Sequence, residues 1–213
     1  MKISGFRVRS FFICCFIILI SFCSSAKSSK LDSLKQVFFN HSKEDTVKAN
    51  LLLFICKEAL KQSDYNKQLA HYAPQLLKLS TKLIFKKGIA YAFYYMSMTD
   101  LKKDAHLIKD EYLQKAFKLM LELKDKKGAS LCYERLGRVK GLDHKYEEAI
   151  QFYSNAIQLK EELGDLNGMA DCYSWMGGIY SHLGDYKKAL EYYINALKIA
   201  ESTNYKNKIC EAY

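Results

Sequence analysis

Proline and glycine are scarce in this chain. Its 213 residues include one proline and ten glycines, too few for the many tight turns of a sheet protein. Lys, Glu, Leu, Ala and Tyr are abundant instead, which favours helices. Hydrophobic residues make up 49% and charged residues 26%, a balance that supports a packed core and not a disordered chain. The composition therefore predicts a folded, all-α protein.

Motifs of catalytic and metal-binding sites are also missing from the sequence. It has no phosphate-binding glycine loop, no HExxH and no nucleophile elbow. No CxxC or Cys/His spacing suits zinc, and the five histidines do not recur at related positions. We therefore expect no enzyme activity and no cofactor within these residues.

The first 26 residues have the layout of a signal peptide. Lys2 and two arginines precede the apolar run Phe11–Phe22, and small residues follow it up to Ala26. The run is shorter than the roughly twenty residues that span a bilayer. We expect cleavage after Ala26, with lipid attachment at Cys23 as the alternative. The protein is then exported to a periplasmic or other extracytoplasmic compartment of a bacterium, and it meets a membrane only through this segment or a helix beyond Tyr213.

Residues 127–166 repeat as residues 167–206. The matching pairs are Gly128 and Gly168, Cys132 and Cys172, Gly137 and Gly177, Ala149 and Ala189, Tyr153 and Tyr193, and Ala156 and Ala196. Apolar residues recur at threes and fours on both sides of a short break, 141–145 in one unit and 183–185 in the next. Each unit is therefore predicted to be an antiparallel helical hairpin. A unit this short cannot bury its own apolar face, so neighbouring units must stack.

The two units resemble the tetratricopeptide repeat. The signature combines a large residue, Leu-Gly and an aromatic in the first helix with Ala, an aromatic and Ala in the second. The matching residues are Tyr133, Leu136, Gly137, Ala149, Tyr153 and Ala156 in one unit and Tyr173, Met176, Gly177, Tyr180, Ala189, Tyr193 and Ala196 in the next. The period of about 40 residues is similar to that of the long-linker variant. The resemblance implies an α-solenoid of stacked hairpins with a right-handed superhelical course.

Weaker copies of the repeat extend toward both ends. We predict four hairpins, at 48–86, 87–126, 127–166 and 167–206, with the start of a fifth up to residue 213. Residues 27–47 should form a segment with a short helix. Pro74 is expected to kink or delay the second helix of the first hairpin. The array has no polar capping helix, so we expect the chain to be a fragment or to be completed by a partner.

Cysteines and lysines have structural explanations. Cys132 and Cys172 occupy equivalent sites in stacked repeats, farther apart than a disulfide allows, so they and Cys56 are interpreted as small core residues. Lysine pairs such as Lys86 with Lys87 and Lys126 with Lys127 are interpreted as complementing the negative ends of helices. Their scatter argues against a nucleic-acid partner.

By the family resemblance, one stripe of each first helix lines a concave wall. On the matching positions the stripe comprises Leu51, Phe54, Glu58, Tyr91, Tyr94, Met98, Leu131, Glu134, Arg138, Asp171, Ser174, Gly178 and His182. The wall changes from aromatic to polar along its length, and an extended peptide could anchor near Tyr94 and be oriented by Arg138. The alternative is that these residues merely cover helix surface. Trp175 is interpreted as packing between hairpins.

Two functions follow from this pattern. The first is a non-enzymatic, exported scaffold that binds a peptide or protein in the groove. The second is the N-terminal sensory part of a membrane-bound bacterial signalling protein, such as a sensor histidine kinase or a transcriptional regulator. Exported arrays with an opening similar to Leu31–Leu34 favour the second function, and an apolar stretch beyond Tyr213 would distinguish it from the first.

Overall fold

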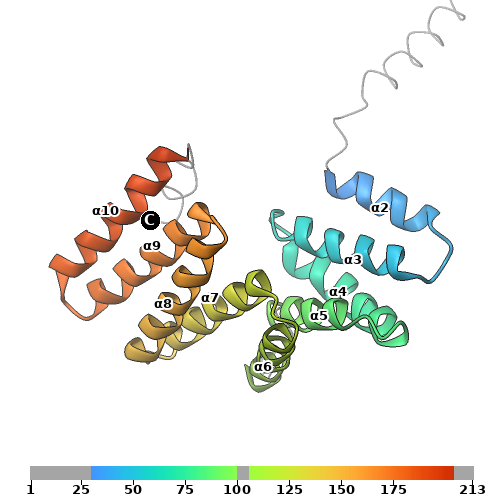
Figure 1. The fold of residues 1–213 in the computed structure, drawn as a ribbon, viewed down its shortest axis with the longest axis horizontal. Helices are drawn as coiled ribbons and strands as arrows, with labels where there is room; N and C mark the ends of the chain where they lie inside the picture. The colour runs from blue at the N-terminus through green and yellow to red at the C-terminus, as the bar shows by residue number, and fades with distance from the viewer. Residues whose placement is uncertain (1–29, 100–105, 204–213) are drawn as a thin grey trace, which may run out of the picture.

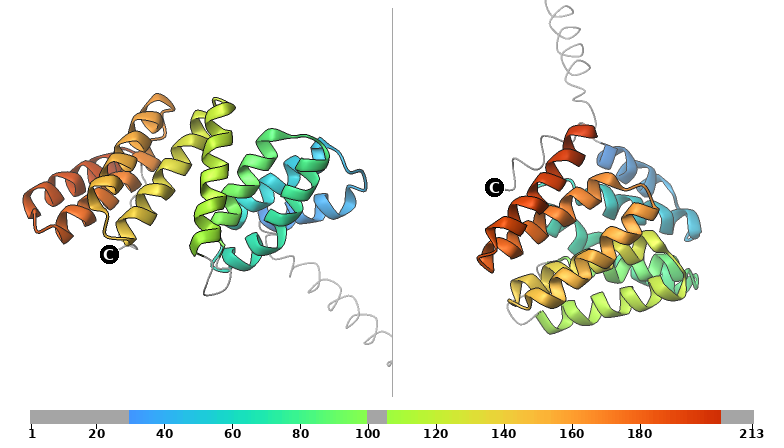
Figure 2. Two further views of the ribbon diagram at one scale, coloured as in Figure 1. Left: turned by 90° about the horizontal axis from the view of Figure 1, so that it is seen from below. Right: turned by 60° about the vertical axis from the view of Figure 1, so that its left-hand side comes forward.

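A bowed array of helices forms the part of the chain that the computed structural model describes, residues 30–99 and 106–203. The helices are α2 (Lys30–Asn40), α3 (Thr46–Ala59), α4 (Tyr65–Lys82), α5 (Lys86–Ser97), α6 (His106–Glu122), α7 (Lys126–Leu142), α8 (Tyr146–Glu162), α9 (Leu166–His182) and α10 (Tyr186–Ser202). They pack in sequential pairs, with α2 and α10 at the two ends of the bow (Figures 1 and 2). The expected all-α hairpin fold is confirmed. The predicted leader and the start of a fifth hairpin lie outside the described residues.

Five of the connections between helices share one turn. The middle residue has a positive φ, and it is Ile84, Lys124, His144, Gly164 or Gly184. The amide of the residue after it donates to a carbonyl five residues back, as from Asp185 to Tyr180 at 3.0 Å. This is the Schellman motif, which satisfies the carbonyls at a helix end. From Lys124 to Gly184 this turn recurs every twenty residues, so α6 to α10 are joined by the same local geometry.

Aspartate caps begin four of the helices. Side chains of Asp45, Asp125, Asp165 and Asp185 accept hydrogen bonds from backbone amides three residues later, at 3.0 to 3.1 Å. Each carboxylate satisfies an amide that has no partner within its own helix. The same short sequence thus ends one helix and starts the next.

Small residues set how closely paired helices approach. A Cβ at Gly177 would lie 2.7 Å from the ring of Tyr193, and one at Gly137 would lie 3.1 Å from the ring of Tyr153. Tyr153 is buried and also belongs to a cluster with Cys172 of the following hairpin. The tyrosines therefore pack first within their own hairpin, and Tyr153 reaches across to the next one.

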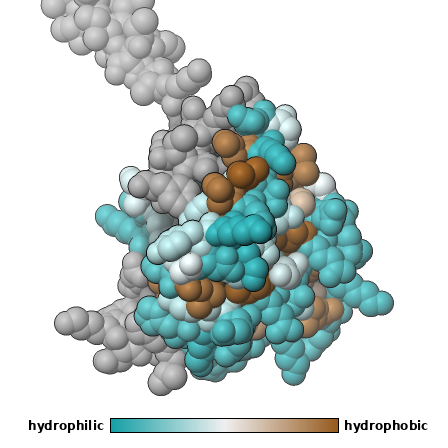
Figure 3. All heavy atoms as spheres, turned by 90° about the vertical axis from the view of Figure 1, so that its left-hand side faces the viewer, coloured by the Kyte–Doolittle hydropathy of each residue, from teal (hydrophilic) through white to brown (hydrophobic). Residues whose placement is uncertain are grey.

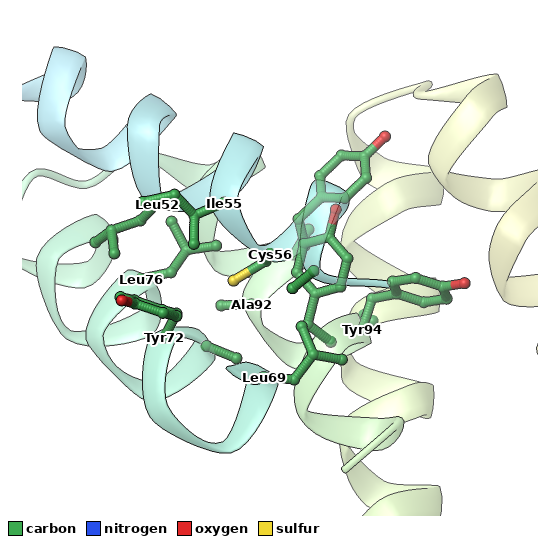
Figure 4. Packing of buried hydrophobic residues seen from close by; sticks show 14 of the residues in the cluster. Leu52, Ile55, Cys56, Leu69, Tyr72, Leu76, Ala92 and Tyr94 are labelled. Atoms are coloured by element: carbon green, nitrogen blue, oxygen red, sulfur yellow. The ribbon is translucent and has the colours of Figure 1, made fainter. Parts of the chain in front are cut away.

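A larger core extends from α2 to α7. Figure 4 shows side chains from α3, α4 and α5 meeting there, among them Leu52, Ile55, Leu69 and Leu76. Cys56, Cys132 and Cys172 are free and buried, as expected from their positions. Burial raises the pKa of the Cys132 thiol to about 12, which makes it unreactive at neutral pH.

The expected role of the lysine pairs is wrong. Lys86 and Lys126 are the first residues of α5 and α7, so the pairs stand at positive helix ends. Two of these lysines form ion pairs instead. Lys87 of α5 pairs at 3.5 Å with Asp125, the cap of α7, and so connects successive hairpins. Lys126 pairs at 2.8 Å with Glu162 at the end of α8 and so closes the open end of its own hairpin.

Two helices depart from the regular pattern. Pro74 lies inside α4 on an exposed face, and the helix begins at Tyr65, so the proline does not delay it. α5 ends at Ser97, where the hydroxyls of Ser97 and Thr99 bond back to carbonyls of the last turn. It is therefore shorter than the 17-residue helices α7 and α9.

Within the described ranges, no helix is long and apolar enough to cross a membrane.

Candidate binding surface

The first part of the expected wall, on α3, is only partly open. Leu51 is half-buried and Phe54 half-exposed, but Glu58 is buried. Its carboxylate pairs with Lys61 at 2.9 Å and with Lys30 of α2 at 3.3 Å. The hydrogen bond from Lys61 lowers the pKa of Glu58, an effect that the Lys30 ammonium supports and burial opposes. Glu58 thus ties α2 to α3 instead of facing a ligand.

The second part, on α5, does not match the expectation. Tyr91 and Tyr94 are buried and belong to the core, so they do not line an open groove. Burial raises the pKa of both phenols, and the neighbouring carboxylates of α7 and its cap add to the effect: Asp125 beside Tyr91 and Glu134 near Tyr94. The two rings fill the space between α5 and α7. Removing Tyr94 would damage the core and would not test a groove.

A cavity of about 460 Å³ lies where α5 ends against α6 and α7. Met98, predicted for the wall, lines it together with Arg138. Further lining residues include Asp110, Leu113, Arg135 and Asp143. The guanidinium of Arg135 donates to the Ser97 carbonyl at 3.4 Å and so connects α7 to the end of α5. The cavity carries charges of both signs and an apolar side.

The predicted wall residues in the first half of α7, Leu131 and Glu134, hold helices together. Leu131 is half-buried and packs on the core. The carboxylate of Glu134 forms an ion pair at 2.9 Å with the ammonium of Lys160 of α8. The side chain of Lys160 is 2% exposed. Burial acts to lower the pKa of Lys160, but Glu134, with a contribution from Asp165, outweighs burial and raises it. This buried lysine joins α7, α8 and the start of α9.

Arg138 and Trp175 form the most exposed contact of the stripe. The guanidinium lies over the indole ring, 5.2 Å from its centroid, and 45% of Trp175 remains exposed. Trp175 therefore contacts the preceding hairpin and also presents part of its ring to solvent. A guanidinium that stacks on a ring keeps its N–H donors in its own plane, where they can bind a carboxylate. The repeat pattern gave no sign of this contact. The residue equivalent to Trp175 one repeat earlier is Arg135, which is not aromatic.

Four predicted residues surround this pair on α9. Asp171, Ser174 and Gly178 are partly exposed and His182 is exposed. The ring of His182 stacks on Tyr146 of α8, with centroids 6.3 Å apart and planes 4° from parallel. We define the α7–α9 surface as Arg138, Asp171, Ser174, Trp175, Gly178 and His182.

The α7–α9 surface combines groups that are common in protein interfaces. It offers an aromatic face, a cation, a carboxylate and a glycine where another backbone can approach. Within the described residues, no group of three or more His, Cys, Asp or Glu side chains could hold a metal ion. A second hollow of about 380 Å³ between α6, α7 and α8 has mostly apolar lining, including Met120, Tyr133 and Leu159. It lies outside the predicted stripe.

These observations define a helical-repeat scaffold with a tetratricopeptide-like fold. The tetratricopeptide repeat model matches residues 170–202, which span most of α9 and α10. No curated protein matches the sequence.

Solved structures that share the fold include the following two. The crystal structure of BtubC (BKLC) from P. vanneervenii is similar with a TM-score of 0.64 and 15% identity over 84% of this chain and 76% of that one. The crystal structure of MamA is similar with a TM-score of 0.51 and 20% identity over 82% of this chain and 88% of that one. At such identities the likeness concerns the fold alone.

Proposed function

We propose that this chain is a non-enzymatic scaffold that binds a protein or an extended peptide through the α7–α9 surface. The observation that carries the proposal is the exposed cation–π contact between Arg138 and Trp175. Trp and Arg dominate the binding energy of protein interfaces, and a Trp that is 45% exposed contributes less to the core than a buried one. Proteins with tetratricopeptide repeats generally bind other proteins, which supports the same proposal.

The chemistry of the α7–α9 surface favours one kind of segment. The in-plane donors of Arg138 suit a carboxylate, and the free part of the indole suits an apolar or aromatic side chain. Asp171, four residues before Trp175, disfavours a second acidic group nearby. A peptide with one acidic residue beside an apolar one fits this pattern.

Variants of the full chain test this function through the capture of partners from extracts of the source cells. Trp175→Ala and Arg138→Ala should each reduce the captured amount at least tenfold, as expected for loss of a residue worth more than about 1.4 kcal/mol. Phe39→Ala removes another exposed aromatic, on α2, and serves as the matched control. Equal capture by Trp175→Ala and the wild type, with helix content unchanged, would contradict the proposal.

We also propose that the scaffold works outside the cytoplasm. The supporting observation is the sequence of basic residues, the apolar run Phe11–Phe22 and small residues up to Ala26. Fractionation of bacteria that express the whole chain should place it outside the cytoplasm, with a new N-terminus at residue 27. Retention of the intact leader in the cytoplasmic fraction would overturn this proposal and would leave the binding surface unaffected.

A further inference from the structure

The outer face of α10 carries an exposed apolar stripe. Tyr186 is 72% exposed, Leu190 60%, Ile194 40% and Leu197 50%. Their spacing of three or four residues puts them on one side of the helix. α10 lies at the end of the bow, paired with α9 (Figures 1 and 2), and Figure 3 shows that end with apolar side chains among polar ones. We call these four residues the α10 stripe.

Comparison with earlier repeats separates Ile194 from the other residues of the α10 stripe. Tyr186, Leu190 and Leu197 correspond to Tyr146, Ile150 and Ile157, which are partly covered where the next hairpin packs. Ile194 corresponds to Ser154, Gln114 and Pro74, and all three remain exposed although another hairpin follows. A helix stacked as α9 stacks on α8 would therefore leave Ile194 uncovered. A partner that also covers Ile194 must therefore be centred differently.

Charges along the edge of the α10 stripe indicate which partner fits. Glu191 lies three residues before Ile194 and Lys198 four residues after it, on the same flank of the helix. When two copies of one helix pack antiparallel, the same flanks face each other. An axis of twofold symmetry near Ile194 then brings Glu191 of each copy beside Lys198 of the other, and Leu190 beside Leu197. Such a surface is complementary to itself, as a twofold interface requires.

We infer that the α10 stripe binds a second copy of this chain, with the two α10 helices antiparallel around Ile194. One helix pair buries a small area, so the dimer is weak and depends on concentration. The stripe shares no residue with the α7–α9 surface. Dimerisation through α10 would therefore leave the α7–α9 surfaces of both copies accessible.

Sedimentation of the full chain at increasing concentrations tests the inference. The wild type should form dimers, whereas Ile194→Ser, which restores the residue of the internal joint, should remain monomeric. Glu191→Lys alone and Lys198→Glu alone should also be monomeric, because each places like charges opposite one another. An equal mixture of these two charge variants should form a heterodimer. Glu122→Lys, a charge reversal on α6, should dimerise as the wild type does.

Two results would overturn the inference. One is a wild type that stays monomeric at every concentration; if deletion of residues 204–213 then induces association, the chain's own segment covers the stripe. The other is a dimer that forms but is insensitive to Ile194→Ser and to both charge reversals, which would place the interface elsewhere. Circular dichroism of each variant verifies that the helices are retained.

Discussion

One hydrogen atom in place of a methyl group at position 177 sets the separation of α9 and α10. A Cβ there would lie 2.7 Å from Tyr193, on a buried and well-packed side of the helix. Gly177→Ala should therefore lower the free energy of unfolding by about 1–3 kcal/mol in urea denaturation, as overpacking does. Gly178→Ala is the matched control, because its Cβ would have 3.8 Å to the nearest atom. It should stabilise by up to about 1 kcal/mol through helix propensity, and the reverse order of the two variants would contradict the packing.

Lys160 gives the stability of the molecule an alkaline limit. The pKa of its ammonium is raised in the folded protein by Glu134. A raised pKa contributes stability that is fully present below the unfolded value of about 10.4 and is lost as the pH rises through the folded value. Between neutral pH and a pH above the folded pKa of Lys160, the free energy of unfolding should therefore fall less for Lys160→Met than for the wild type. Urea denaturation at each pH measures this difference. Parallel curves for the two proteins would show that the ion pair with Glu134 contributes nothing.

At the scale of the helix, α8 begins without a side-chain cap. Lys145 has φ −89° and ψ 69°, close to the −85° and 70° of Asp185, whose carboxylate caps α10. Lys145→Asp should therefore add a cap and raise the free energy of unfolding by about 1 kcal/mol. Asp185→Ala should lower it by a similar amount. The prediction fails if Lys145→Asp leaves the urea midpoint unchanged or lowers it.

The turn between α4 and α5 holds an unfavourable residue. Ile84 has a φ of +53° and a side chain that is 80% exposed, so it bears the strain without a packing contact in return. Ile84→Gly should stabilise the protein by about 1 kcal/mol in thermal denaturation. The converse change, Gly184→Ala, should destabilise it because Gly184 has a φ of +77° and open space around it. A lower midpoint for Ile84→Gly would contradict this interpretation.

For the whole molecule, the sequence predicted the class of fold well. It predicted less well which residues are exposed on the surface. The spacing of Gly137, Tyr153 and Ala156 and of their copies defines two hairpins, because backbone contact and ring size leave few other residues at those positions. Tyr91 and Tyr94 share the phase of exposed wall residues, but they are buried. Their burial depends on how far α5 lies from α7, a distance that periodicity does not specify.

The exposure of Trp175 could not be predicted from the repeat for a related reason. Its equivalent in the preceding repeat is Arg135, which is partly buried. Exposure at this position depends on Arg138 of α7, which lies over the ring in three dimensions. A contact between residues of different repeat phases leaves no periodic signal in the sequence. Surface residues of an array are therefore harder to predict than the residues that join its helices.

Site-specific photo-crosslinking tests the central claim most directly, since it reports what touches the α7–α9 surface. A photoreactive phenylalanine replaces Trp175 in one full-length variant and Phe39 in another, and both are illuminated in cells of the source. The account predicts a discrete protein adduct from position 175 that is absent or much weaker from position 39. The same adducts from both positions, or none from position 175, would contradict it.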